Sequence, residues 1–274
     1  MKKIYKKLIV SDFDGTLITS SHNIPDRVSS AIQEYVECGG VFAVCTGRML
    51  RSILPRVRQL GLKGLVVAYQ GSVIAEIESG KIIKNGGLSV GDAVEICRYI
   101  EDCGYCINAY SEEILYTDIP KEEKHLQLYE KITGVEANSV DGKISDFIME
   151  NNLVCQKLAS LVAPADREKL YRGLSQKFGD RFDVTCSAEV LVEISPLGDN
   201  KGEALKFIAE YYGIPLSSTV AVGDNLNDLP MIITASVGVA VGNAVDSLKQ
   251  AADFVSVAND ECAVAQIIEK FGFK

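Results

Sequence analysis

The sequence predicts an α/β protein in which a parallel sheet wrapped by helices is interrupted by an inserted α+β segment. In the first and last parts of the chain, short apolar runs alternate with segments of helical spacing. This pattern is typical of parallel sheets that are covered on both faces. In the middle of the chain, apolar and polar residues alternate within the expected strands, which indicates a sheet with one solvated face. The 274 residues suffice for two domains of ordinary size.

The expected core strands are short apolar runs, at 8–10, 41–44, 65–67, 220–222 and 237–240. The expected core helices are 25–38, 49–60 and 201–212. A glycine follows each helix, where C-caps are common, and these glycines are Gly39, Gly61 and Gly213. We therefore expect residues 1–85 and 189–274 to form one discontinuous core domain.

Residues 86–188 are expected to form the inserted domain. Its expected strands are 114–116, 156–161 and 182–185, and its expected helices are 89–102, 121–132 and 164–178. The insertion would begin after Gly86-Gly87 and end near Ser187, at two crossings of the chain that could serve as hinges.

Charge and hydropathy exclude several partners. The net charge of −9 argues against nucleic acid or an anionic membrane, because proteins that bind them carry broad basic surfaces. No apolar run reaches the roughly 18 residues needed to cross a bilayer. The basic N-terminus precedes only the short apolar run Leu8–Val10, whereas a signal peptide needs roughly 7–15 apolar residues. We expect a cytoplasmic protein that is a monomer or a small homo-oligomer.

One pair of the eight cysteines, Cys103 and Cys106, has the CxxC spacing of redox and metal sites. A closed zinc site would need more ligands, and the sequence has neither a second CxxC nor a nearby histidine. The favoured interpretation is that the cysteines are small buried apolar residues in a reducing compartment. A redox role for the pair stays open.

Acidic residues directly follow two of the expected core strands. Asp12 and Asp14 come after the first strand, and Gly15 allows a tight turn there. Asp224 and Asp228 come after the fourth strand, with amide side chains between them. Because α/β sheets bind ligands at the carboxyl ends of their strands, these carboxylates would share a crevice and could hold Mg²⁺. The alternative interpretation is an acidic turn and a solvated loop.

Two further segments suit a phosphate group. Thr46 and Gly47 follow the second expected strand and offer a hydroxyl and a backbone N–H. Lys201 begins an expected helix, where the helix dipole favours anions. A lysine in that position is explained if it faces a carboxylate cluster and a phosphate. Each of these segments alone could be an ordinary turn or a solvated side chain. Together with the two acidic segments they make four, and chance would not often place all four in this order at successive strand ends.

Taken together, these residues resemble the haloacid dehalogenase superfamily phosphatases, and more closely the Cof-type branch with a large α/β cap of the C2 type. The similarity spans the chain and is carried by DFDGTL at 12–17, TGR at 46–48, NKG at 200–202, GDNLNDLPMI at 223–232 and GNA at 242–244. The resemblance implies a Rossmann-like core, an inserted cap, and hydrolysis of the phosphomonoester of a small metabolite such as a sugar phosphate.

The resemblance also implies roles for individual residues. Asp12 would be the nucleophile that forms a phosphoryl-aspartate, and Asp14 the general acid and base. The residues that would bind the phosphoryl group are Thr46, Gly47, Lys201 and Asn227. The ligands of Mg²⁺ would be Asp12, the backbone carbonyl of Asp14, and Asp224, with Asp228 in support. Since nucleophile and phosphate are both anionic, Mg²⁺ and Lys201 would relieve their repulsion.

Two positions depart from the family pattern. Gln70-Gly71 stands after the third expected strand, where the family commonly has Asn-Gly, and Cys262-Ala263 replaces an Asp-Gly near the C-terminus. Neither position belongs to the catalytic set.

Two other functions use similar residues. A phosphomutase would share the aspartyl-phosphate chemistry and return the phosphoryl group to its substrate instead of to water. A phospho-accepting receiver domain also uses Asp, Thr and Lys on a parallel sheet. Receiver domains are far shorter, however, and lack both the insertion and the pair formed by Asp12 and Asp14.

Overall fold

The computed structural model describes residues 2–188 and 190–274. The chain divides into two compact units. The core unit comprises the residues up to Gly47 together with Ile53–Ile83 and Asn200–Lys274, and the inserted unit comprises Arg48–Ser52 and Lys84–Asp199.

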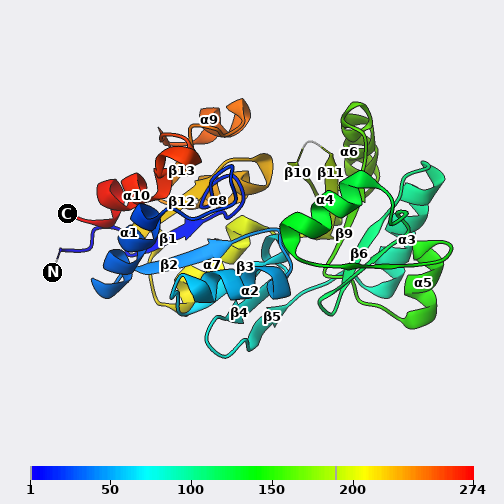
Figure 1. Cartoon of the computed structure of the whole chain (residues 1–274), viewed down its shortest axis with the longest axis horizontal. Coiled ribbons are helices and arrows are strands. Elements are labelled where there is room, and N and C mark those ends of the chain that lie inside the picture. Colours follow the sequence, from blue (N-terminus) through cyan, green and yellow to red (C-terminus); the bar gives the residue numbers. More distant parts are fainter. Residues whose placement is uncertain (1, 189) are drawn as a thin grey trace. The chain divides into compact units, whose positions relative to one another are not determined.

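The core unit contains an eight-stranded sheet with the strand order β14-β13-β12-β1-β2-β3-β4-β5. The strands are β1 (Leu8–Ser11), β2 (Val41–Cys45), β3 (Leu65–Ala68), β4 (Val73–Glu76), β5 (Ile82–Asn85), β12 (Thr219–Gly223), β13 (Val237–Ala240) and β14 (Phe254–Val255). All pairings from β14 to β3 are parallel, and β4 turns back antiparallel to β3. Figure 1 shows strands from the two ends of the chain side by side, with β1 in blue and β12 in yellow.

The central strands of this sheet are buried along their whole length, as runs of apolar residues require. Every residue of β1, β3 and β12 is buried. The helices of the core unit are α1 (Asp26–Glu37), α2 (Leu50–Gln59, which belongs to this unit from Ile53 on), α7 (Lys201–Tyr211), α8 (Leu229–Thr234), α9 (Asp246–Ala251) and α10 (Ala263–Ile267). Helix α1 packs against α10, and α7 packs against α8. The predicted parallel sheet wrapped by helices is confirmed.

The inserted unit contains a six-stranded sheet with the order β10-β11-β9-β6-β7-β8. Its strands are β6 (Asn108–Ser111), β7 (Ile114–Thr117), β8 (Ala137–Ser139), β9 (Lys157–Leu161), β10 (Phe182–Ala188) and β11 (Leu191–Pro196). Its helices are α3 (Val90–Asp102), α4 (Lys124–Thr133), α5 (Ile144–Asn151) and α6 (Pro164–Phe178). Apolar residues of the sheet and of α3, α5 and α6 form one buried cluster.

The inserted unit ends later than the predicted limit at residue 188. Strand β11 pairs antiparallel with both β10 and β9, so the unit extends to Asp199. Residue 189, the predicted first residue of the second core segment, lies outside the described residues. The sequence pattern could not reveal this limit, because the sheet to which a strand belongs depends on the strands with which it pairs.

The expectation of a solvated sheet face in the insertion is wrong at β6 and β9. Lys157 is 2% exposed and forms an ion pair with Glu193, whose side chain is 3% exposed. Tyr110 is buried, and its hydroxyl donates to the hydroxyl of Tyr129 on α4 at 2.8 Å. Lys157, Glu193 and Tyr110 are therefore buried and paired, which removes the penalty of an unpaired buried polar group at these positions. The amide of Asn108, two residues before Tyr110 on β6, is also buried but has no hydrogen-bond partner among the described residues.

The cysteines agree only in part with the interpretation as buried apolar residues. Cys45, Cys97, Cys155 and Cys186 are buried, but Cys103 is exposed and Cys106 is half-buried. All eight cysteines are free thiols. No helix in the described part of the chain has both the length and the apolar character to cross a membrane.

Candidate active site

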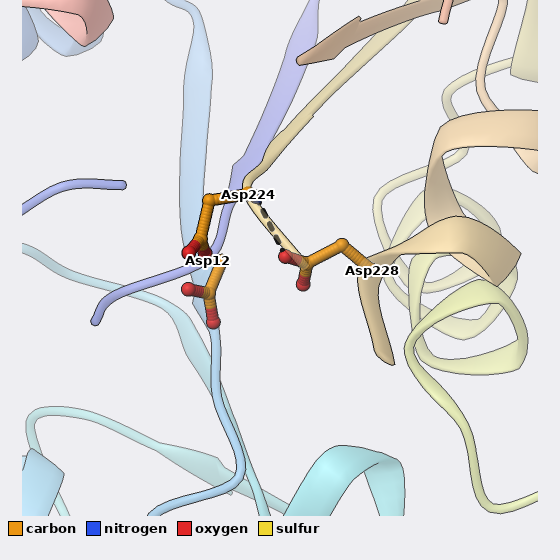
Figure 2. Close-up of side chains that lie close together, drawn as sticks. All are labelled: Asp12, Asp224 and Asp228. Carbon is orange, nitrogen blue, oxygen red and sulfur yellow. Dashed lines mark hydrogen bonds between the residues drawn. The ribbon is translucent and has the colours of Figure 1, made fainter. Parts of the chain in front are cut away.

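Three carboxylates meet at one edge of the core sheet. Asp12 directly follows β1, and Asp224 and Asp228 follow β12. These strands are parallel neighbours, so their carboxyl ends lie side by side. The backbone N–H of Asp12 also donates to the carbonyl of Val222 at 2.9 Å. Figure 2 shows the carboxylates of Asp12 and Asp224 pointing toward one another, with Asp228 beside them.

Lys201 is a buried cation within this carboxylate cluster. It is the first residue of α7 and is 0% exposed. Its Nζ donates to Oδ1 of Asp12 at 2.5 Å and to Oδ1 of Asp228 at 2.6 Å. Burial alone would lower the pKa of Lys201, but the two carboxylates raise it above the ordinary value, so the side chain stays charged. This contact accounts for a lysine at the start of a helix.

Asp228 holds the loop after β12 in place. Its Oδ2 accepts the backbone N–H groups of Asp224 at 2.8 Å and of Asn225 at 3.0 Å, while Oδ1 binds Lys201. Both oxygens are engaged in contacts within the protein, and the side chain is fully buried. Asp228 therefore fixes the positions of both Lys201 and Asp224.

Burial and the neighbouring acids raise the pKa values of Asp12 and Asp224. The pKa of Asp12, which is 4% exposed, is raised well above its ordinary value by burial, and Asp228, Asp224 and Asp14 add to the rise against Lys201. The pKa of Asp224 is raised to about 7 by burial and by Asp228. So many acids around one lysine suit a site that binds an additional cation.

The donor set fits a hard divalent metal ion. One carboxylate oxygen from each of Asp12, Asp224 and Asp228 lies within 4.8 Å of the others. All three donors are oxygens, which Mg²⁺ and similar ions prefer. Because Asp228 already uses both oxygens, Asp12 and Asp224 are better placed as ligands.

The loop after β1 is packed tightly against Asp224. Gly15 has a φ of 74°, and a Cβ on it would lie 2.5 Å from Oδ2 of Asp224. The hydroxyl of Thr16 donates to Oδ1 of Asp224 at 3.2 Å, and Nδ2 of Asn243 donates to the carbonyl of Gly15 at 2.8 Å. No role for Thr16 or Asn243 was predicted from the sequence. Both lie in segments that carry the family resemblance, which is the signal that could have found them.

The remaining predicted residues lie near this cluster or are linked to one another. Asp14 is half-buried, and its charge acts on Asp12. Thr46 follows β2, the other neighbour of β1, and is buried. Asn227 lies in the loop after β12, and its Nδ2 donates to Oε1 of Gln70 at 3.1 Å. The side chain of Gln70 in turn lies against Gly47.

Fold and site together define a class: an α/β protein with a mainly parallel sheet and a buried cluster of acids around one lysine at the carboxyl ends of its strands. A family model described as haloacid dehalogenase-like hydrolase matches residues 9–268. The chain belongs to this family of hydrolases.

Individual relatives agree with this assignment. The chain is 30% identical to Phosphatase YwpJ of Bacillus subtilis over 96% of this chain and 99% of that protein. It is 27% identical to 5-amino-6-(5-phospho-D-ribitylamino)uracil phosphatase YcsE of the same species, over 96% of this chain and 94% of that protein. A solved haloacid dehalogenase-like hydrolase from B. subtilis has a TM-score of 0.86 at 25% identity, with 96% and 99% of the two chains covered. The expectation of a phosphatase of this superfamily is confirmed.

Proposed function

We propose that the protein hydrolyses the phosphomonoester of a small metabolite with Mg²⁺, through a phosphoryl-aspartate on Asp12. The observation that carries this proposal is a buried carboxylate held by a buried lysine beside a second acid whose pKa is raised to about 7. Asp12 and Asp224, with the backbone carbonyl of Asp14, would hold the metal ion. When bound, the ion would neutralise negative charge on the phosphate and its nucleophile.

The proposed reaction has two steps. First, the oxygen of Asp12 that Lys201 does not bind attacks phosphorus, and the bond to the leaving oxygen breaks while Asp14 gives that oxygen its proton. Asp14 then accepts a proton from a water molecule whose oxygen attacks the phosphoryl-aspartate. This second step releases inorganic phosphate and restores the Asp12 carboxylate. A carboxylate nucleophile thus divides one difficult step into two easier ones.

Phosphate binding is proposed for the residues around the acidic cluster. Lys201 is already charged and fixed by Asp12 and Asp228, so it needs no reorganisation when the anionic phosphoryl group arrives. Thr46, Gly47 and Asn227 would bind the phosphoryl oxygens from the ends of β2 and β12. The inserted unit would act as a cap that selects the leaving group and excludes water.

The proposed substrate is a small phosphorylated metabolite such as a sugar phosphate. Relatives that cover most of this chain are named as phosphatases, and the name of one of them gives a small phosphorylated compound, 5-amino-6-(5-phospho-D-ribitylamino)uracil. We also propose a cytoplasmic protein, a monomer or small homo-oligomer, that binds neither nucleic acid nor membranes, in keeping with the net charge of −9.

The test is a phosphatase assay over sugar, nucleotide and cofactor monophosphates, with and without Mg²⁺. We expect multiple turnovers that release inorganic phosphate, loss of activity with a chelator, and inhibition by Ca²⁺, which takes more ligands than Mg²⁺. Borohydride reduction of the enzyme during turnover should convert residue 12 to homoserine, detected by peptide mass spectrometry. Full activity after exhaustive chelation, or labelling at another residue, would contradict the proposal. A phosphomutase would instead transfer the phosphoryl group within or between sugars without net release.

A further inference from the structure

The segment after β3 has an unusual backbone conformation. Tyr69, Gln70 and Gly71 have φ values of 50°, 61° and 125°, so three consecutive residues have positive φ. Non-glycine residues rarely adopt this conformation, and they persist in it only where the surroundings hold them. Tyr69 and Gln70 are nevertheless buried. The contacts of this turn therefore hold it in a strained conformation.

Gln70 contacts two segments that carry proposed phosphate-binding residues. Its backbone N–H donates to the carbonyl of Thr46 at 3.0 Å. Its side chain lies over Gly47, where an added Cβ would come within 2.4 Å of Nε2. Its Oε1 accepts the hydrogen bond from Nδ2 of Asn227. With 5% exposure, the side chain is fixed between these two segments.

Gly71 brings the same turn against a third segment. An added Cβ on Gly71 would lie 2.7 Å from the carbonyl oxygen of Asn200. Asn200 caps α7 by accepting the N–H groups of Gly202 and Glu203, and the first residue of that helix is Lys201. The turn thus touches the segments that carry Gly47, Asn227 and Lys201.

Asn227 has an incomplete set of hydrogen bonds. It is 9% exposed, and its Oδ1 has no hydrogen-bond partner among the residues that the structure describes. One hydrogen of Nδ2 is directed to Gln70, and an amide nitrogen carries a second. Oε1 of Gln70 can only accept a hydrogen bond, so the nitrogen of the Asn227 amide, and not its oxygen, faces Gln70.

We infer that Gln70 is a positioning residue for phosphate binding, which acts by orienting the amide of Asn227. Holding Nδ2 against Gln70 leaves the second N–H of Asn227 to donate to a phosphoryl oxygen. The strained backbone of the turn places Oε1 of Gln70 within hydrogen-bonding distance of Asn227. The Gln70 side chain passes directly over Gly47, where even a methyl group would collide with it. This inference rests on the proposed function. It adds Gln70 to the proposed phosphate-binding site as a residue that does not itself contact the reacting atoms.

The experiment measures binding of inorganic phosphate by calorimetry in the presence of Mg²⁺, together with kcat and KM for p-nitrophenyl phosphate. Gln70→Met keeps the length of the side chain but removes the acceptor. We expect about tenfold weaker phosphate binding and a KM raised by a similar factor, the loss typical of one hydrogen bond to a charged ligand. Gln70→Gly relieves the backbone strain and serves as a second variant, with the same expected loss, should Gln70→Met fold poorly.

A double-mutant cycle separates positioning from a general structural role. In an Asn227→Ala background, Gln70→Met should cause no further loss, because the amide that Gln70 is inferred to orient is already removed. Ser72→Ala is the matched control, since Ser72 is buried in the same turn and its hydroxyl has no partner among the described residues. It should leave phosphate binding unchanged.

Unchanged phosphate binding in both Gln70 variants, or an equal loss in the Asn227→Ala background, would overturn the inference. Failure of the proposed function would look different. In that case the unmodified protein would bind phosphate without turning over any phosphomonoester, and the Gln70 variants would still report on binding.

Discussion

At the scale of single residues, the site is built around one buried lysine between two buried acids. Such a triad contributes little net stability, because desolvation of the charges offsets most of their attraction. Its role is better described as preorganisation: Lys201 fixes one oxygen of Asp12 at 2.5 Å and ties it to Asp228. The charges are therefore in place before any phosphate binds.

The first prediction concerns the nucleophile. Asp12→Asn should reduce turnover to background, because an amide of nearly the same shape is a very poor nucleophile. The melting temperature should stay the same or rise, since one of several crowded buried acids is removed. Steady-state assays and thermal melts of the purified variant check both parts. Turnover at the unmodified rate would show that another residue attacks the phosphate.

At the scale of elements, two neighbouring parallel strands determine the site. Register places Ser11 opposite Val222, so the residues after β1 and β12 leave the sheet at the same edge. Asp12 and Asp224 are more than 200 positions apart in the sequence, yet the strand pairing brings them together. The turns after these strands must be compact, and glycine makes this possible at Gly15.

The second prediction tests that turn. Gly15→Ala should destabilise the protein by about 1–2 kcal/mol from the positive φ alone, and its Cβ should displace the carboxylate of Asp224. Higher Mg²⁺ concentrations should then be needed for half-maximal activity. Gly213→Ala is the matched control, because Gly213 has a φ of 63° and nothing within 4 Å of an added Cβ. Gly213→Ala should cost similar stability and leave the Mg²⁺ requirement unchanged. If both variants needed more Mg²⁺ for half-maximal activity, the effect would result from lost stability alone.

At the scale of the whole molecule, two units with separate sheets share one chain. The acidic cluster, Lys201 and Asn227 all belong to the core unit. The core unit therefore contains the groups proposed for the chemistry. The inserted unit carries its own buried apolar cluster.

The third prediction links pH to global stability. The folded-state pKa of Asp224 is about 7, above the ordinary 3.8. The neutral acid is therefore favoured in the folded state, and the stability it contributes is fully present below about pH 4 and lost as the pH rises through 7. Without metal, the melting temperature should fall between about pH 4 and pH 7 and level off above pH 7, whereas Mg²⁺ should offset the fall by binding the ionised acids. Scanning calorimetry with and without Mg²⁺ checks this.

Asp224→Asn serves as the control for that measurement. The variant cannot ionise at this position, so its melting temperature without metal should depend less on pH between about 4 and 7. An equally steep fall in the variant would assign the pH dependence to other groups.

The fourth prediction concerns the inserted unit. Replacing residues 84–199 with a short Gly/Ser linker should abolish selectivity between the best natural substrate and a small generic ester, while some generic hydrolysis survives. The physical reason is that the core unit alone holds the proposed phosphoryl site. Rates with both substrates, alongside circular dichroism of the shortened protein, give the answer. Unchanged discrimination in a folded product would show that the core selects the substrate.

The sequence by itself determined the class of fold and the positions of the acidic residues, because hydrophobic pattern is local. Runs such as Leu8–Val10 must be buried wherever they lie, and the residues that follow them must emerge at a strand end. The contact of Lys201 with a carboxylate cluster could be anticipated from its position at the start of a helix, where the helix dipole favours anions. These conclusions needed no knowledge of which strands pair.

Only the tertiary structure decided which residues meet. The pairing of β11 with β9 and β10 moved the end of the insertion, and the ion pair between Lys157 and Glu193 buried a face that the pattern marked as solvated. The contact between Gln70 and Asn227 joins residues 157 positions apart through a strained turn. Such contacts depend on register and on backbone conformation at single residues, and neither is encoded in the periodicity of a segment.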